Sequence, residues 1–252
     1  MATRSLLCNL ARTAPSPASK RFYSSLSTSG VVGLTRLREH YYTTLQDDLM
    51  YLTYEHPKPD APVTESKANK IRRGNKPLKP TPPPKSSRTV PELQKIDVHC
   101  MVKEAILSKT NLLSAIMAIQ SITGVRPEIV FARTGAATWK LREGMPIGCK
   151  VTLKGDKMYT FLDKLVEIVL PRMKEWQGLP ITAGDGNGNI AMGFPASALS
   201  LFPDIESNYD MYPRMTGFHV VFNTTAYTNL DGRLLLSGFG IPFQKKMGKK
   251  SS

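Results

Sequence analysis

The sequence predicts an α+β fold, in which a mainly antiparallel sheet carries helices on one face, with basic disordered or extended segments outside it. Four short stretches alternate apolar and polar residues or concentrate β-branched side chains, which is typical of strands with one buried face. Four longer stretches repeat apolar residues at helical spacing. With 252 residues, 41% of them hydrophobic, the chain is long enough for one core with tails.

The first predicted helix covers residues 35–54, and it belongs to an N-terminal segment that we bound at 24–56. Its apolar residues recur near helical spacing at Leu37, Tyr41, Leu45, Leu49 and Leu52. The body of the protein, residues 93–244, begins with a predicted strand whose apolar residues are Ile96, Val98, Cys100 and Val102.

A second helix is predicted over 110–122, where Thr110 is able to cap the start and Gly124 ends the helix. The next helix, over 156–169, is bent or ended by Pro171, which cannot continue the backbone hydrogen bonding. The other predicted elements of the body are strands at 129–133, 147–153 and 218–225 and a helix at 230–239.

The net charge of +14 lies in the extensions and not in the body. Residues 1–38 carry six basic and no acidic side chains, 57–88 carry nine basic against two acidic ones, and the basic tail 245–252 has four lysines. The stretch 39–56 holds four acids and no base, while 89–244 has a net charge of only +1. The extensions are therefore expected to attract polyanions, and if the body binds RNA, it must do so through shape and local contacts.

A Pro-rich basic insertion, residues 57–92, separates the first helix from the body. Eight prolines and almost no aliphatic residues lie between Pro57 and Arg88, so this stretch buries too little apolar surface to offset chain entropy. A passive spacer is one interpretation. The basic cluster that includes Arg72 and Arg73 favours the other, in which the insertion becomes ordered against RNA.

Residues 1–23 are expected to be a mitochondrial targeting presequence. They are basic, free of acids and rich in Ser and Ala, and Leu6, Leu7 and Leu10 can line one side of a helical turn. The motif RFYS at 21–24 resembles a matrix processing site with cleavage after Tyr23. The alternative is a basic N-terminus with no targeting role.

The composition argues against several other classes of protein. Cys8, Cys100 and Cys149 form no CxxC pair and the histidines show no ligand spacing, so neither a zinc site nor a disulfide framework is supported. The glycine-rich run 184–189 lacks the ligands of a calcium loop or P-loop and is interpreted as a mobile turn. No catalytic constellation is visible, so we expect no enzyme, metal or cofactor. No apolar run is long enough to span a membrane.

The most informative segment is ARTGAATWKLREGMPIGCKVTLKG, residues 132–155. It ends in a strand with one buried face, and the loop before that strand combines small residues with cations, which suits close approach to phosphates. Spacing alone leaves an ordinary hairpin with a solvated tip equally open.

This segment resembles the signature region of the large-subunit ribosomal protein five family, which belongs to the central protuberance of the ribosome. The similarity continues through ITGVRPEIVFART, FLDKLVEIVLPRMKEWQGLP, GDGNGNIAMGF, LFPDI and GFHVVFNTTAYTNLDGRLLLSGFGIPF, and HYYTTLQDDLM resembles the family's first helix. Roughly 170 residues are covered in the right order, the size of one domain. The resemblance implies an α+β body, and the presequence indicates a mitochondrial member of the family. The replaced amides described below favour the fungal type.

The resemblance implies one site in the loop 134–146, which in the family reaches toward the elbow of the peptidyl-site (P-site) tRNA. The residues that would approach the tRNA backbone are Thr134, Gly135, Ala136, Ala137, Lys140 and Arg142. Small residues at the tip allow close packing on a polyanion. The family also contacts the small-subunit head in an intersubunit bridge, which we expect around 178–190 and 207–216.

The second implied site is a sheet face that, in bacterial-type relatives, binds 5S rRNA through two side-chain amides, an aromatic residue and a threonine. The aromatic residue and the threonine are kept in kind here, but both amides are replaced, which favours a ribosome without 5S rRNA. The matching positions are His99, Val125, Trp139 and Thr152, and the further rRNA-binding candidates are Arg133, Arg72 and Arg73. Trp139 fits a core position equally well, because aromatic side chains both pack cores and stack on bases.

The expected function is therefore structural. The protein would bind large-subunit rRNA in the central protuberance of the mitochondrial ribosome, in the matrix, and contact the P-site tRNA and the small-subunit head during translation. Neighbouring central-protuberance proteins are its other expected partners, and it has no membrane span. The alternative is a mitochondrial RNA-binding ribosome-assembly factor, which mature ribosomes would not retain.

Overall fold

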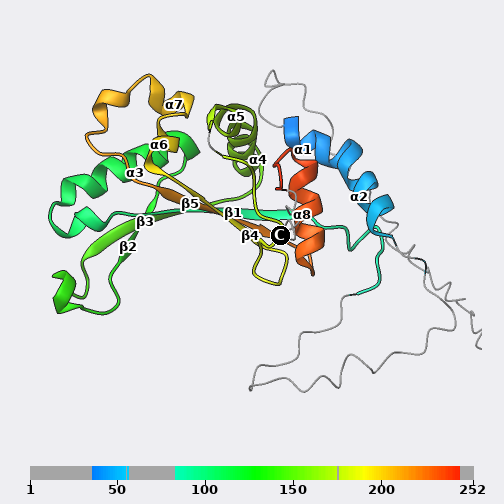
Figure 1. The fold of residues 1–252 in the computed structure, drawn as a ribbon, viewed down its shortest axis with the longest axis horizontal. Helices are drawn as coiled ribbons and strands as arrows, with labels where there is room; N and C mark the ends of the chain where they lie inside the picture. Colours follow the sequence, from blue (N-terminus) through cyan, green and yellow to red (C-terminus); the bar gives the residue numbers. More distant parts are fainter. Residues whose placement is uncertain (1–35, 55, 57–82, 175, 245–252) are drawn as a thin grey trace, which may run out of the picture. The chain divides into compact units, whose positions relative to one another are not determined.

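Five strands form one antiparallel sheet in the order β2-β3-β1-β5-β4 (Figure 1). The computed structural model describes residues 36–54, 56, 83–174 and 176–244. The strands are β1 (Leu93–Met101), β2 (Glu128–Phe131), β3 (Pro146–Leu153), β4 (Ile190–Phe194) and β5 (Phe218–Thr224). The predicted α+β class with a mainly antiparallel sheet is confirmed, and β4 is a strand that the sequence analysis did not predict.

Four of the helical segments correspond to predicted helices. The first predicted helix is one continuous helix that contains a π-helical segment. The third predicted helix contains a second π-helical segment and ends just after Pro171. These four are α1 (Arg36–His40) with η1 (Tyr41–Leu45) and α2 (Gln46–Thr53); α3 (Lys109–Thr123); α4 (Asp156–Lys164) with η5 (Leu165–Val169) and α5 (Leu170–Arg172); and α8 (Asn229–Gly238). Short helices not predicted from the sequence are η3 (Lys103–Ile106), η4 (Ala137–Trp139), α6 (Ala196–Leu199), α7 (Pro203–Glu206) and η6 (Tyr209–Met211).

Two predicted details of α3 have different outcomes. Gly124 ends the helix with a left-handed φ of 62°, as predicted, because glycine has no Cβ to clash in that conformation. Thr110 is not the N-cap: Ser108 holds that position with an extended backbone, and Thr110 already lies inside the first turn. The two hydroxyl groups lie 2.6 Å apart and are hydrogen-bonded to each other, and the Ser108 side chain makes no capping hydrogen bond to the helix backbone.

Helices α3 and α4 cover one face of the sheet (Figure 1). Ile96, Val98 and Cys100 of β1 point into this covered side, where they join one core cluster with aromatic rings. Phe161 and Phe202 stack with their ring centroids 6.3 Å apart. Cys100 and Cys149 are free buried thiols, and the two residues face each other across β1 and β3.

The α1–α2 helix is fixed to the body along its buried side. Leu37, Tyr41, Leu45 and Leu49 are buried as predicted, whereas Leu52 is 67% exposed and does not belong to this packed face. The phenol of Tyr41 donates a hydrogen bond of 2.9 Å to the carbonyl of Pro91, which joins the helix to the segment before β1. Arg36 and Arg38 form ion pairs with carboxylates of the α4–η5 helix, namely Asp163 and Glu167 for Arg36 and Asp156 for Arg38.

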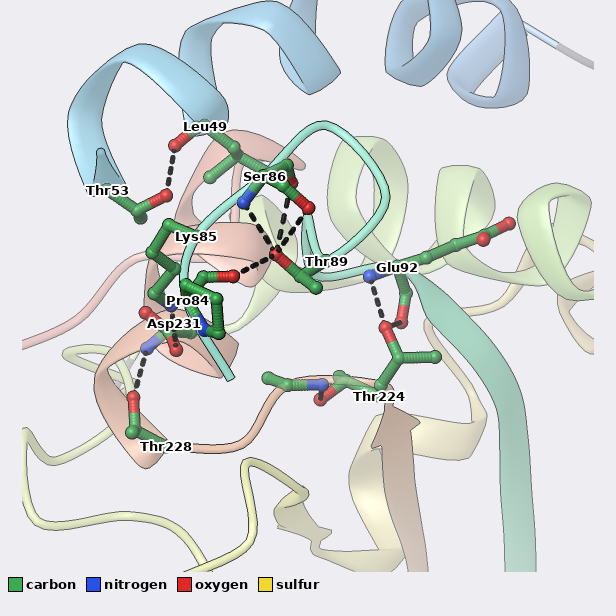
Figure 2. A network of polar contacts seen from close by, with 12 residues as sticks. Leu49, Thr53, Pro84, Lys85, Ser86, Thr89, Glu92, Thr224, Thr228 and Asp231 are labelled. Atoms are coloured by element: carbon green, nitrogen blue, oxygen red, sulfur yellow. Dashed lines mark hydrogen bonds and ion pairs between the residues drawn. The ribbon is translucent and has the colours of Figure 1, made fainter. Parts of the chain in front are cut away.

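The end of the predicted insertion is held in place by polar contacts (Figure 2). Nζ of Lys85 lies 2.7 Å from a carboxylate oxygen of the buried Asp231 in the first turn of α8, a helix that Thr228 caps through the backbone N–H of Asp231. The hydroxyl of Thr89 accepts a hydrogen bond from the backbone N–H of Ser86. Residues 83–92 are therefore part of the ordered body, while residues 57–82 of the insertion lie outside the described residues.

Replacing Lys85 with alanine should lower the free energy of unfolding by about 1 kcal/mol, because it leaves the Asp231 carboxylate buried without its cation. We place the loss below the roughly 3–5 kcal/mol of a fully buried pair because the Lys85 side chain is 26% exposed. Urea denaturation measures the effect. The double variant Lys85→Ala/Asp231→Asn should recover part of the loss, since no unpaired charge remains; an equal or larger loss in the double variant would contradict this account.

Candidate nucleic-acid interface

The sheet face opposite to α3 and α4, here called the open face, carries polar and charged side chains. Asp97 and His99 of β1 alternate with buried residues, so both point to this face. The strand register places His99 between Lys150 of β3 and His219 of β5, in one row across the sheet. The same register places Asp97 opposite Thr152. The open face therefore presents two imidazoles and a lysine side by side.

Asp97 is the most strongly held group of the open face. Its carboxylate accepts hydrogen bonds from Thr152 at 2.5 Å and from the side-chain amide of Asn223 at 2.9 Å. Lys95 and Lys150 lie 3.5 and 3.6 Å away. Burial alone would raise the pKa of this carboxyl, but the hydrogen bond from Thr152 and the two lysine charges outweigh burial and lower the pKa below its ordinary value. Asp97 is therefore charged at neutral pH and partly neutralises the lysines around it.

His99 and His219 stack on each other, with ring centroids 5.0 Å apart and an angle of 23° between the rings. Burial, then the neighbouring His219 and Lys150, lower the pKa of His99, and Asp97 opposes the shift only in part. Gly193 of the edge strand β4 lies opposite His219 and leaves room for the ring, since a Cβ there would lie 3.1 Å from its Nδ1. Flat imidazoles beside a lysine are suited to contact both bases and phosphates of RNA.

The loop between β2 and β3 is ordered by its own backbone. Ala136 and Leu141 exchange two hydrogen bonds of 2.9 and 3.1 Å, and a short 3-10 turn, η4, forms the tip between them. Lys140 ends this turn in a left-handed conformation with a φ of 56°. The loop continues the β2–β3 ladder beyond the sheet, so its tip is held at a defined place by the strands.

The residues predicted to contact tRNA gather in this loop. Ala136 is half-buried and the others are exposed, which leaves the two cations Lys140 and Arg142 accessible. The exposed members are Thr134, Gly135, Ala137, Lys140 and Arg142. The loop thus presents a cationic tip with little side-chain bulk, which is suited to the backbone of a nucleic acid.

The predicted rRNA-binding residues do not form one cluster. His99 and Thr152 lie on the open face, but Trp139 and Arg133 belong to the loop, where both are exposed. Trp139 is 74% exposed, so the core interpretation of this residue is wrong. Val125 is partly buried against the core and offers no polar group to RNA. Arg72 and Arg73 lie outside the described residues.

Sequence reasoning missed part of the open face. The members it missed are Lys95, Asp97, Lys150, His219 and Asn223. A signal for them existed, because each occupies a polar position of an alternating strand. The alternation shows only which side of each strand faces solvent. Which of these side chains lie next to one another depends on the register between strands.

The glycine-rich loop 184–189 is an irregular turn, as expected from the sequence, and hydrogen bonds hold it against the body. The carboxylate of Asp185 accepts hydrogen bonds from the backbone N–H groups of Asn187 and Asn189 at 2.7 and 3.2 Å. The side-chain oxygen of Asn229, in the first turn of α8, accepts hydrogen bonds from Gly186 and Gly188 at 3.0 and 3.1 Å. These contacts fix the loop against α8, so its composition serves close backbone packing.

Two further properties concern the part of the chain that the structure describes. Within residues 36–54, 56, 83–174 and 176–244, no three His, Cys, Asp or Glu side chains lie together in an arrangement that would hold a metal ion. In the same residues, no helix combines the length and apolar character needed to cross a membrane.

Comparison with known proteins gives consistent matches over the body. The family model for ribosomal protein L5 matches residues 87–142, and the model for the C-terminus of the same ribosomal protein family matches residues 146–243. The large ribosomal subunit protein uL5m of Schizosaccharomyces pombe is 41% identical over 85% of this chain and 81% of its own length. The uL5m of Neurospora crassa is 33% identical over 85% of this chain, which spans 66% of that relative. The bacterial uL5 of Macrococcus caseolyticus is 43% identical over 62% of this chain and 85% of its own length.

Matches of this extent define the chain as a ribosomal protein. It belongs to the ribosomal protein L5 family, and its similarity to the two fungal uL5m proteins confirms the expected mitochondrial, fungal-type member and its location in the mitochondrial ribosome. Because the family consists of structural proteins of the ribosome, the expectation that the protein is not an enzyme is confirmed as well.

Proposed function

We propose that the protein is a structural constituent of the mitochondrial large ribosomal subunit, where its open face binds large-subunit rRNA in the central protuberance. The observation that supports this most strongly is the row formed by Lys150, His99 and His219, which lies on a sheet face that α3 and α4 do not cover. A second contact, between the loop 134–146 and the elbow of the P-site tRNA, is supported by the exposed Lys140 and Arg142.

The open face is proposed to bind large-subunit rRNA and not 5S rRNA. In this chain neither position that carries an amide in bacterial-type relatives has an amide side chain. The side chain of Val125 is apolar and packs against the core, and the imidazole of His99 offers a hydrogen-bonding geometry that differs from that of an amide. Polar groups of 5S rRNA facing these positions would lose their partners, at a cost of about 1–3 kcal/mol each.

RNA–protein crosslinking on purified mitochondrial large subunits tests this proposal. Crosslinks from peptides around His99 and Lys150 to large-subunit rRNA are the expected result. Crosslinks from the same peptides to a separate 5S rRNA would refute the choice of partner but leave the ribosomal function intact. If the protein is absent from mature subunits and present only on precursors, the assembly-factor alternative is correct instead.

The variant Lys140→Ala/Arg142→Ala is expected to weaken retention of P-site tRNA without preventing assembly of the subunit, because two phosphate-binding cations are lost from a loop whose backbone bonds remain. Binding of tRNA to purified ribosomes at two salt concentrations measures the change, and the variant should show the weaker dependence on salt. Loss of assembled subunits in this variant would instead give the loop a structural role.

A contact with the small-subunit head is proposed for the segments 178–190 and 207–216, and with it a place in an intersubunit bridge. The loop 184–189 supports this proposal because Asn229 and Asp185 hold it rigid at the surface, as a docking contact between subunits requires. Tyr209 and Met211 in the second segment are exposed apolar side chains. Crosslinks between these segments and a small-subunit protein in intact ribosomes would support the bridge, and their absence would count against it.

A further inference from the structure

The α1–α2 helix has a second, partly apolar face, which is largely exposed in the part of the chain that the structure describes. Asp47, Met50, Tyr51 and Tyr54 stand at positions i, i+3, i+4 and i+7, so they share one side of the helix. This side points away from the buried Leu45 and Leu49. The four residues line a shallow groove of about 390 Å³, and Tyr51 is 88% exposed. We call these four residues and the adjacent Asp48 the outer stripe.

The outer stripe is acidic as well as aromatic. Asp47 and Asp48 are exposed, and within the described residues neither takes part in an ion pair. The two arginines of the same helix, Arg36 and Arg38, are engaged with carboxylates of the α4–η5 helix. The positive charges of Arg36 and Arg38 are therefore neutralised by the α4–η5 helix and not by Asp47 or Asp48. The outer stripe thus keeps a negative surface in a protein whose net charge is +14.

We propose that the outer stripe docks a lysine- or arginine-rich segment of a neighbouring ribosomal protein. Like charge disfavours RNA at this surface, since phosphates would approach two unpaired carboxylates. A basic polypeptide fits each feature of the stripe. Its cations pair with Asp47 and Asp48 and lie over the ring of Tyr51, and its aliphatic stems cover Met50.

The outer stripe lies away from the loop 134–146, so a protein can bind the stripe while RNA binds the loop. Helix α2 packs on α8, and α8 packs on β4. The strand β4 is the sheet edge opposite to β2, from which the loop 134–146 extends. A protein bound to the stripe is therefore separated from the loop by the width of the sheet, and the two contacts are compatible.

The test uses the full-length protein in assembled mitochondrial large subunits, with the photo-crosslinking residue p-benzoylphenylalanine in place of Tyr51. The expected result is a crosslink, mapped by mass spectrometry, to a Lys- or Arg-rich segment of another protein of the subunit. Crosslinks to rRNA, to residues 57–82 of the same chain, or to a segment without basic residues would overturn the proposal, as would the absence of any crosslink.

A charge-reversal variant tests the electrostatic part. Asp47→Lys/Asp48→Lys should reduce the yield of the Tyr51-site crosslink at least tenfold. The control Glu39→Lys/Glu206→Lys makes the same change of charge at exposed acids outside the stripe and should leave the yield unchanged. Equal effects of the two variants would show that net charge, and not the stripe, controls the contact.

The inference rests on the proposed place in the large subunit, and sedimentation separates the two failures. A protein that does not co-sediment with large subunits refutes the proposed function itself. A protein that co-sediments but gives no basic-segment crosslink refutes only the docking surface.

Discussion

Gly232→Ala is expected to lower the free energy of unfolding by about 3 kcal/mol, the upper part of the range for overpacked sites. Intrinsic propensity predicts the opposite sign, because alanine in a helix interior is favoured over glycine by about 1 kcal/mol. The packing decides the outcome. A Cβ on Gly232 would lie 2.3 Å from the carbonyl oxygen of Gly188, and that neighbour is backbone, which cannot rotate away as a side chain can.

Neither partner in this close approach is able to move freely. Gly188 lies in the loop 184–189, where its N–H donates to Asn229 and its carbonyl accepts a 2.9 Å hydrogen bond from the hydroxyl of Thr224. Gly232 lies inside α8, whose first turn holds the ion pair of Asp231 with Lys85. Displacing either backbone would therefore break further bonds.

Chemical denaturation followed by circular dichroism measures the effect of Gly232→Ala. Ser237→Ala is the matched control, since it introduces alanine at an exposed position of the same helix, and there it should be neutral or slightly stabilising. A Gly232→Ala variant as stable as the parent would show that the loop and helix separate at low cost, contrary to the hydrogen-bond network described above.

Asp97→Ala should have opposite effects on stability and on RNA binding. Asp97 is 8% exposed, and its removal leaves the Thr152 hydroxyl and the Asn223 amide without their acceptor. We expect a loss of about 1–3 kcal/mol in the free energy of unfolding at pH 7. The same change frees Lys95 and Lys150 from their counter-charge, so affinity for RNA should rise and depend more steeply on salt.

The pH dependence of the Asp97 effect has a defined sign. The folded protein lowers the pKa of Asp97 below the ordinary value of 3.8, so the charged carboxylate stabilises the fold at every pH above that value. This contribution is lost as the pH falls from 3.8 through the lower pKa of the folded state. The difference in unfolding free energy between the parent and Asp97→Ala should therefore be constant from neutral pH to about pH 5 and shrink in acid.

Denaturation across this pH range and binding to an rRNA fragment at two salt concentrations test both halves of the Asp97 prediction. Asp185→Ala is a suitable control, because its carboxylate also has a lowered pKa but lies in the loop 184–189 and not on the open face. A gain in RNA affinity equal to that of Asp97→Ala would show that net charge alone is responsible.

The elements that could be predicted from the sequence are those with a strong local pattern. The alternation from Ile147 to Leu153 and the helical spacing of Leu37, Tyr41, Leu45 and Leu49 both correspond to buried faces in the fold. The strand β4 was missed because it is only five residues long and places Ala191 and Gly193, which carry little pattern, at its outward positions.

The open face could be predicted only in part. Its assembly depends on the register that brings Lys150 and His219 to either side of His99, and register arises from pairing between segments far apart in the chain. The resemblance correctly placed His99 and Thr152 on one sheet face, but it could not show that Val125 is turned into the core or that Trp139 is exposed in the loop. Those outcomes depend on tertiary packing between distant segments, which local sequence patterns do not reveal.

The contact of Lys85 with Asp231 has a consequence for how the protein tolerates insertions. The chain leaves the body at the end of α2 and is fixed again at α8, and these two helices pack together. The described residues on either side of positions 57–82 are thus anchored on neighbouring helices, and neither anchor depends on the residues between them. An affinity tag inserted between the two anchors is therefore expected to leave both of them, and with them the body, unchanged.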